Sequence, residues 1–293
     1  MELVTKDDVK IFKGKYYLPY VKYQTTKTLS SSKIVVFDLD ETLGSFADLY
    51  IIWRGVKHIW VDCRNFYDLV DIFPEFLRYG VLTILKYLYD KKKKRQVQQV
   101  ILYTNNQCQG DWLKELISYF EFKLNTQTRK LFDKVIGPYK INSTQVEKNR
   151  TSHKKTIKDL NQFLLPNNKN GHICFIDDVL FNEMKTNNVY YICPRPYAHT
   201  LSRNTIFKRL INIKWLPSKL QSLNTSSFWK LWFSIHHYKT KRPLDNQMAI
   251  DLQISKKILM HLKDFVEYKT NVNHNYTKKF QKRKTNKKTK KIR

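Results

Sequence analysis

Two pairs of aspartates follow short apolar segments of this chain, and they are the residues best suited to chemistry. Asp38 and Asp40 come directly after one such segment, and Asp177 and Asp178 come after another. Where a strand ends, two carboxylates that are close in sequence can both face a single ligand. Carboxylate oxygens suit Mg²⁺, which takes one or two carboxylates together with waters and substrate phosphate. We therefore expect these four carboxylates to hold a magnesium ion.

Phosphoryl transfer is the reaction that such acids and a magnesium ion favour. A phosphoryl group near Asp38 would repel a carboxylate nucleophile, so a cation and fixed donors must first neutralise its charge. Asp38 would then attack phosphorus to give an aspartyl-phosphate, and Asp40 would protonate the leaving oxygen and later activate water. Thr104 can donate to phosphate oxygens, a lysine before the third strand can complete the charge balance, and Thr42 can tie down the loop. The alternative is that residues 38–42 form only a turn, with Thr42 as a helix cap.

Alternating strand and helix patterns must position these residues. Short apolar runs rich in β-branched residues predict buried strands, and apolar residues at helical spacing predict helices. The alternation is typical of an α/β fold with a doubly wound (Rossmann-like) parallel sheet. The carboxyl ends of parallel strands share one edge of a sheet, so the candidate residues are expected to converge there. Strands are predicted at 34–37, 100–102, 132–137, 172–178 and 188–193, and helices at 74–90, 111–120, 152–165 and 226–237.

The flanking regions are less regular. Residues 1–32 are expected to form a lead-in with a short edge strand at 16–23. In residues 44–70 the apolar residues do not repeat with a clear helical or strand period, which favours a flap or small insertion over the site. Residues 33–268 are predicted to form one domain. Residues 269–293 form a basic tail that cannot bury enough apolar surface to become ordered. A last helix, packed on the core, is predicted from an apolar stripe at Ile250, Ile254, Ile258, Leu262 and Phe265.

The charge of the chain indicates an anionic partner or surface. Its 293 residues carry a formal net charge of +29, which favours nucleic acid, an acidic protein or a phosphorylated segment as partner. A composition biased towards Lys, Asn, Ile and Tyr would explain part of this charge without any partner. The basic tail predicts nuclear import or contact with a phosphate backbone, and a solubilising end is the alternative.

The cysteines and the apolar runs favour a soluble intracellular protein. The four cysteines are scattered without a CxxC pair, so they indicate neither a zinc site nor a disulfide framework, and they favour a reducing compartment. The first residues lack the pattern of a signal peptide, and no apolar run approaches the roughly 18 residues needed to cross a bilayer. We expect no membrane association, and a nuclear location if an import receptor binds the tail, or otherwise a cytoplasmic one.

Four stretches resemble the motifs of the haloacid dehalogenase (HAD) superfamily. They are DLDET at 38–42, LYTNN at 102–106, a lysine-bearing helix at 153–160 and FIDD at 175–178. The DLDETL form, followed by a proline-started helix containing EFL, is similar to the FCP/SCP-type phosphatases that act on the carboxy-terminal domain (CTD) of RNA polymerase II. It resembles in particular the CTD phosphatase-like proteins of large DNA viruses. The resemblance covers roughly residues 33–265.

The resemblance also implies roles for individual residues. Lys154, Lys155 and Lys158 all precede the fourth motif at suitable distances, and we favour Lys155, near the start of its helix, as the phosphate-site lysine. The fourth motif is Asp-Asp where the cellular CTD phosphatases usually have Asp-Asn, which keeps the metal site but departs from those enzymes. The remaining roles are nucleophile for Asp38, acid and base for Asp40, phosphate binding for Thr104 and Asn105, positioning for Thr42, and metal or metal-water ligands for Asp177 and Asp178.

The gaps between the motifs bear on the substrate. Neither gap is long enough for a large cap domain, so we expect a HAD-type sheet with an open site and a helical C-terminal extension. An open site favours a macromolecular substrate over a small metabolite. We therefore predict a Mg²⁺-dependent phosphatase that acts on phosphoserine or phosphothreonine of a protein. Two alternatives stay open, namely a nucleic-acid end phosphatase and a noncatalytic basic protein that keeps the fold and binds nucleic acid or protein.

Overall fold

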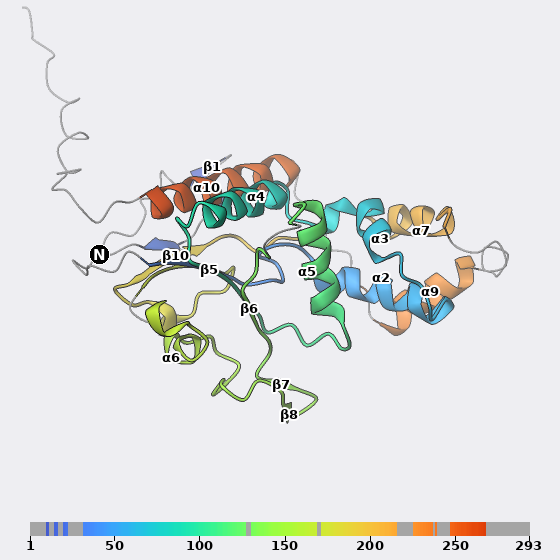
Figure 1. Ribbon diagram of the computed structural model, residues 1–293. Helices are drawn as coiled ribbons and strands as arrows, with labels where there is room; N and C mark the ends of the chain where they lie inside the picture. The colour runs from blue at the N-terminus through green and yellow to red at the C-terminus, as the bar shows by residue number, and fades with distance from the viewer. Residues whose placement is uncertain are drawn as a thin grey trace, which may run out of the picture.

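A sheet with helices on both faces forms the centre of the molecule, and a further group of helices extends beyond one end of it (Figure 1). The basic tail at 269–293 and most of the lead-in at 1–32 lie outside the described residues, so the expectations for them stay predictions. The computed structural model describes residues 10–11, 15–16, 20–22, 32–126, 130–168, 171–215, 225–236, 238 and 247–267.

The central sheet has the strand order β3-β10-β9-β4-β5-β6, and all of its neighbours are parallel except β3, which runs antiparallel to β10 at one edge. The chain runs outward from β4 through β5 to β6, then crosses back to β9 and β10 on the other side of β4. The strand order therefore reverses between β4 and β9, which is where ligands bind in open α/β sheets. The bounds are β3 Tyr20–Lys22, β4 Lys33–Phe37, β5 Gln99–Tyr103, β6 Lys134–Ile136, β9 His172–Ile176 and β10 Val189–Cys193.

The five predicted strands of the parallel sheet are confirmed, and the edge strand is confirmed in part. Among the described residues within 16–23, β3 joins the central sheet and Tyr16 belongs to a separate hairpin. The first two short strands pair with each other, and a second short hairpin lies between β6 and β9 with Asn142 and Ser143 at positive φ in its turn. These hairpins comprise β1 Lys10–Ile11, β2 Lys15–Tyr16, β7 Lys140–Ile141 and β8 Thr144–Gln145.

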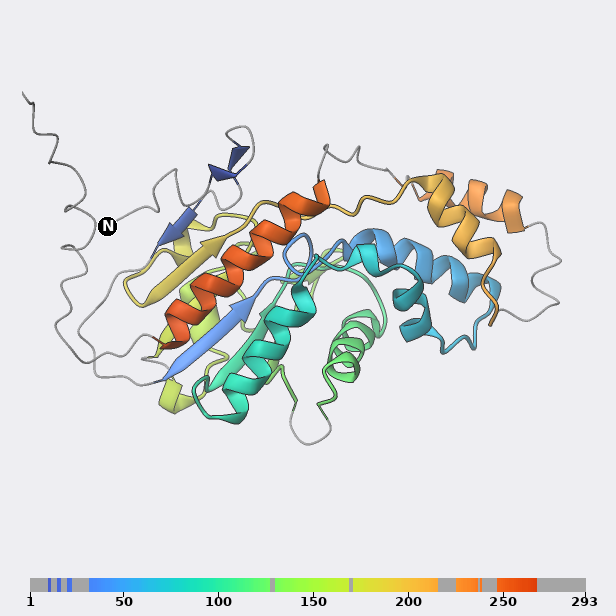
Figure 2. The same ribbon diagram turned by 90° about the horizontal axis from the view of Figure 1, so that it is seen from above.

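Both faces of the inner part of the sheet are buried, which explains why β4, β5, β9 and β10 consist mostly of apolar residues. Along β4 the side chains alternate, so that Val35 and Phe37 join the core on one face while Ile34 and Val36 join the core on the other. Figure 2 shows α4 and α10 lying side by side across the first face. The helices on this face include α4 Val81–Lys93, α5 Trp112–Lys123 and α10 Gln247–Glu267, and the other face carries α6 Ile157–Asn161 with the single turns η2 Pro166–Asn168 and η3 Asn182–Met184.

The helix predicted at 74–90 is placed wrongly at its start. Only a single 3-10 turn, η1 Pro74–Phe76, forms there, and the α-helix begins at Val81 after Gly80 in a left-handed conformation with φ of 80°. The chain between the two is held against the acidic loop, because the Arg78 N–H donates to the Leu43 carbonyl at 2.9 Å. Proline therefore opens a turn that packs behind the acidic motif and delays the helix.

The helix predicted at 152–165 is also shorter than expected. It spans only Ile157–Asn161, and Thr156 caps it instead of Ser152, since the Thr156 hydroxyl accepts a hydrogen bond from the Asp159 N–H at 3.0 Å. The residues before the cap, including Lys155, are extended or bent and lie against the ends of the strands. A lysine placed before the helix can therefore reach the site directly.

The segment 44–70, where a flap or small insertion over the site is expected, folds into two helices of a helical lobe rather than into a flap. Its buried aromatic and aliphatic residues join the same core cluster as residues of the sheet and of α9. Gly55 permits the close approach of α9, since a Cβ atom there would lie 2.4 Å from the Trp229 ring. The helical lobe consists of α2 Phe46–Ile59, α3 Phe66–Ile72, α7 Arg203–Ile211 and α9 Thr225–Ile235.

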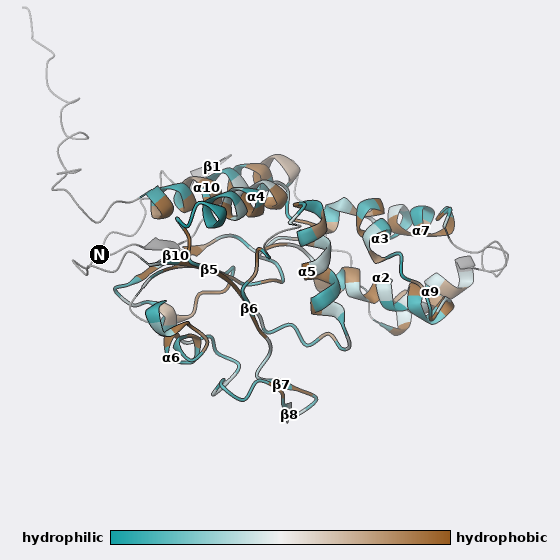
Figure 3. Ribbon diagram, in the orientation of Figure 1, coloured by the Kyte–Doolittle hydropathy of each residue, from teal (hydrophilic) through white to brown (hydrophobic). Residues whose placement is uncertain are grey.

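The C-terminal helices carry mixed surfaces. Figure 3 shows hydrophobic and hydrophilic residues interleaved along α10 and along the helices of the lobe. The five residues of the stripe predicted for the last helix are all buried, which confirms that prediction. Among the described residues, no helix combines the length and the apolar character needed to cross a membrane.

Candidate active site

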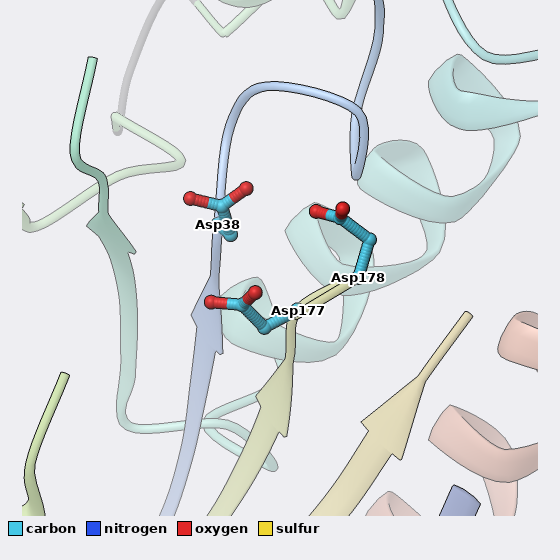
Figure 4. Close-up of side chains that lie close together, drawn as sticks. All are labelled: Asp38, Asp177 and Asp178. Carbon is cyan, nitrogen blue, oxygen red and sulfur yellow. The ribbon is translucent and has the colours of Figure 1, made fainter. Parts of the chain in front are cut away.

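Three aspartates meet where the strand order reverses (Figure 4). Asp38 follows β4, and Asp177 and Asp178 follow the neighbouring strand β9; the Asp38 N–H donates to the Ile176 carbonyl at 2.9 Å, so the two strand ends are level. One carboxylate oxygen from each aspartate lies within 4.8 Å of the other two. The predicted convergence of these three acids is confirmed, and their donor set fits a divalent cation.

Lys155 is the lysine that the structure brings into this group. Its ammonium donates to Asp38 Oδ1 and, at 2.7 Å, to Asp177 Oδ2, and the side chain is only 2% exposed. Burial alone would lower the pKa of Lys155, but the two carboxylates outweigh it and raise the pKa above its ordinary value. Lys154 instead pairs with Glu183 at the surface, and Lys158 is exposed on α6. Lys155 therefore enters the site as a charged group.

Asp40 lies next to this group without belonging to it. Its Oδ2 accepts a hydrogen bond from Asn106 Nδ2 at 2.7 Å, while its Oδ1 is buried without a hydrogen-bond partner. Burial and the nearby Asp38 carboxylate raise the pKa of Asp40 to about 7. The geometry thus separates Asp40 from the three carboxylates that could share a metal, and its pKa suits an acid that later acts as a base at neutral pH.

Thr42 joins the loop after β4 to the loop after β9. Its hydroxyl donates to Asp178 Oδ1 at 3.0 Å and accepts from the Asp178 N–H at 3.0 Å. This is the positioning contact expected of Thr42, and it excludes the alternative in which Thr42 only caps a helix. Burial and the nearby Asp38 raise the pKa of Asp178 to about 6.

Arg78 supports the same loop from behind, and the sequence analysis missed it. The side chain is 1% exposed; its Nε donates to the Thr42 carbonyl at 2.6 Å, and its Nη2 donates to the Glu41 carbonyl at 2.6 Å and to the Arg195 carbonyl at 2.9 Å. Glu41 has a φ of 59°, a conformation that costs energy for a residue with a side chain unless its surroundings hold it. The guanidinium therefore fixes a strained turn of the acidic motif.

The residues after β5 divide between the cavity and the interior. Thr104 is fully buried, and its hydroxyl accepts a hydrogen bond from the Asn106 N–H at 2.9 Å. Asn105 and Asn106 line the cavity that the aspartates also line, whereas Thr104 is buried and is not part of this lining. Asn106, whose side chain contacts Asp40, was not among the candidates; the doubled asparagine after Thr104 is the only sequence pattern that could have indicated it. The phosphate-binding roles of Thr104 and Asn105 stay predictions.

Arg150 is a second buried arginine that the sequence analysis missed. Its Nη1 donates to the carbonyls of Thr104 at 3.0 Å and Gly137 at 2.8 Å, and its Nη2 donates to Asn105 Oδ1 at 2.8 Å and to the His153 carbonyl at 3.1 Å. One side chain thus links the ends of β5 and β6 to the segment that leads to Lys155. We call this segment, residues 150–155, together with the loops at 38–45, 104–106 and 177–181, the strand-end loops.

These groups surround an open cavity of about 250 Å³. Its lining contains five carboxylates, one ammonium group, two amides and two apolar side chains. The site is therefore locally acidic although the chain as a whole carries a net charge of +29. The lining residues are Asp38, Asp40, Glu41, Asn105, Asn106, Lys155, Asp177, Asp178, Val179 and Phe181.

Comparison of the chain with models of protein families, with curated proteins and with solved structures found no match. An acid-rich cavity with one fixed ammonium can hold a divalent cation and a phosphate monoester together, because each neutralises charge that the other leaves uncompensated.

Proposed function

We propose that this chain is a HAD-type, Mg²⁺-dependent phosphatase that works through an aspartyl-phosphate and acts on phosphoserine or phosphothreonine of a protein. The observation that carries the proposal is the pair of acids on one loop. Asp38 accepts a hydrogen bond from the Lys155 ammonium, while burial and the nearby Asp38 raise the pKa of Asp40, two residues later, to about 7. A nucleophile oriented by an ammonium group and a proton donor are thus placed on one loop.

Asp38 supplies the nucleophile in the first step. One of its oxygens forms a bond to phosphorus while the bond from phosphorus to the substrate oxygen breaks, and Asp40 gives its proton to that leaving oxygen. In the second step Asp40, now a carboxylate, takes a proton from water, whose oxygen attacks the same phosphorus. The bond between Asp38 and phosphorus then breaks, and inorganic phosphate leaves.

The donors around the site orient these two acids. Lys155 fixes one oxygen of Asp38, and Asn106 fixes one oxygen of Asp40. Asp38, Asp177 and Asp178 would hold the magnesium ion, which supplies positive charge against the phosphoryl oxygens. Arg78 and Arg150 touch only protein groups at the site and act as positioning residues.

The lining of the cavity favours a protein substrate over a nucleic acid. A nucleic acid brings a row of phosphates, and these need several cations along their path. The cavity lining offers one ammonium group and five carboxylates, which suits a single phosphate monoester. The noncatalytic alternative is disfavoured because burying Asp38 and Asp177 close together, with the half-buried Asp40 and Asp178 beside them, is costly and needs a compensating use.

The test is hydrolysis of an aryl phosphate with Mg²⁺ or with EDTA. We expect Mg²⁺-dependent release of phosphate that falls by at least about 1,000-fold in Asp38→Asn, because the nucleophile is lost. Asp62→Asn changes an exposed aspartate of the helical lobe in the same way and should keep full activity. Activity that survives in Asp38→Asn or that does not respond to EDTA would contradict the proposed mechanism. Faster turnover of a 5′-phosphorylated oligonucleotide than of a phosphoserine peptide would favour the nucleic-acid alternative.

A further inference from the structure

Three consecutive apolar residues, Val179, Leu180 and Phe181, directly follow Asp178, one of the acids that line the cavity. Val179 is 52% exposed and Leu180 is 41% exposed, while Phe181 is partly buried against the core of the second sheet face. Val179 and Phe181 line the cavity that holds the aspartates. Single exposed apolar residues are common on proteins, but a run of them beside a reactive site calls for an explanation.

The backbone of this apolar rim, residues 179–181, is held rigidly. The Tyr191 hydroxyl donates to the Val179 carbonyl at 2.6 Å and accepts from the Phe181 N–H at 2.9 Å. The Val179 N–H donates to Asp177 Oδ1 at 2.8 Å. Because these bonds fix the loop to β10 and to the metal site, Val179 and Leu180 stay exposed without the freedom to turn inward.

The rim also differs chemically from the rest of the cavity. The other lining residues are acids, amides and the one lysine, so no other part of the lining offers apolar contact. When the phosphate of a substrate fills the acidic part of the cavity, the rest of the substrate must extend outward through the open side. An apolar group beside that phosphate would bury surface against the rim and gain free energy in proportion to the area covered.

We propose that Val179, Leu180 and Phe181 form a subsite for an apolar side chain next to the phosphorylated residue of a polypeptide substrate. This inference rests on the proposed function. Successive residues of an extended peptide are separated by about 3.3–3.6 Å, so a side chain one or two positions from the phosphorylated residue reaches the rim while the phosphate stays near Asp38. The occupant is a polypeptide because the rim adjoins an acidic wall that disfavours a second phosphate.

The test compares phosphoserine peptides that carry Leu or Ser at each of the two positions on either side of the phosphorylated residue. We expect kcat/KM to be about tenfold higher for Leu at one of these positions, which is the size of effect that one apolar contact at an open site supplies. In Val179→Ser/Leu180→Ser this ratio should fall to about one. Val61→Ser changes an aliphatic residue that is 72% exposed in the loop after α2, and it should keep the ratio.

Binding of the same peptides to Asp38→Asn, measured by fluorescence anisotropy, distinguishes a failure of the proposed subsite from a failure of the proposed phosphatase activity. Hydrolysis without preference for Leu at any position, or a preference that survives Val179→Ser/Leu180→Ser, would overturn the subsite and leave the phosphatase standing. A preference for Leu in binding without turnover by the native chain would support the subsite and overturn the phosphatase. Absence of both binding and hydrolysis would overturn both.

Discussion

The strand-end loops and the helical lobe are ordered by different forces. In the strand-end loops, buried ions and amides hold one another through short hydrogen bonds, as Lys155 does with Asp38 and Asp177. In the lobe, order comes from the fit of large rings, such as Trp229 against Gly55. Hydrogen bonds fix atoms to within fractions of an ångström, while ring packing supplies most of the stability. Changes in the first region should therefore affect turnover, and changes in the second should affect stability.

Among the substitutions considered, Arg150→Lys should reduce turnover the most relative to its effect on stability. A lysine cannot reproduce the four hydrogen bonds that the guanidinium makes, so Asn105 and Lys155 should lose their fixed spacing. We expect kcat to fall by about 10- to 100-fold, with a smaller change in KM, because misplacement of catalytic groups acts mainly on the transition state. Steady-state kinetics with an aryl phosphate measure this.

Arg209→Lys is the matched control for that prediction. Arg209 is also a hydrogen-bonded arginine, but it joins α7 to Glu75 and touches no residue of the cavity lining. It should lower the melting temperature and leave kcat near its native value. Equal losses of kcat in Arg150→Lys and Arg209→Lys would show that general loosening, rather than positioning, explains the effect.

Gly55→Val tests the lobe. The new side chain would overlap the Trp229 ring, where even a Cβ atom would lie 2.4 Å from a ring carbon. We expect the free energy of unfolding to fall by about 1–3 kcal/mol and the melting temperature by several degrees, with turnover at low temperature retained. Gly137→Val adds the same side chain where a Cβ atom meets nothing within 4 Å. Its melting temperature should change less; a larger loss than for Gly55→Val would contradict this account of the lobe.

Glu75→Gln should have the smallest effect, at a contact between η1 and the lobe helix α7. Burial alone would raise the pKa of Glu75, but hydrogen bonds from Arg209 lower it below its ordinary value of 4.5. The native pair therefore stabilises the fold above that value, and the contribution disappears as the pH falls through the lowered pKa. We expect Glu75→Gln to cost about 0.5–1 kcal/mol at pH 7 and progressively less as the pH falls below 4.5. Melting temperatures measured from pH 7 downward would show this, and a difference that does not shrink with falling pH would exclude the ion pair as its cause.

The parallel sheet and its acids could be predicted because their sequence signals are local. A buried strand of about five apolar residues followed at once by Asp38 or Asp177 contains both the element and its chemistry. The choice among the three lysines depended on where a short helix begins. That start is set by Thr156, whose capping bond leaves Lys155 outside the helix and beside the acids.

The helical lobe and the buried arginines could not be predicted in the same way. The buried residues of α2 recur at helical spacing, but the partly buried Tyr50, Ile51 and Ile59 lie among them and obscure that spacing in the sequence. Arg78 and Arg150 bind carbonyl groups that are distant in sequence, and every residue carries a carbonyl. The sequence pattern therefore cannot indicate which carbonyl groups these two arginines bind.

The strand order also determines when the site can assemble during protein synthesis. β4 is made early, but its neighbour β9 is made more than a hundred residues later, and β3 waits for β10 in the same way. A nascent chain that ends before β9 exposes one side of β4 and holds Asp38 without Asp177 or Asp178. Pairings between distant segments form slowly, and open strand edges are prone to aggregation. The ribosome-bound chain should therefore depend on chaperones until β9 and β10 have emerged.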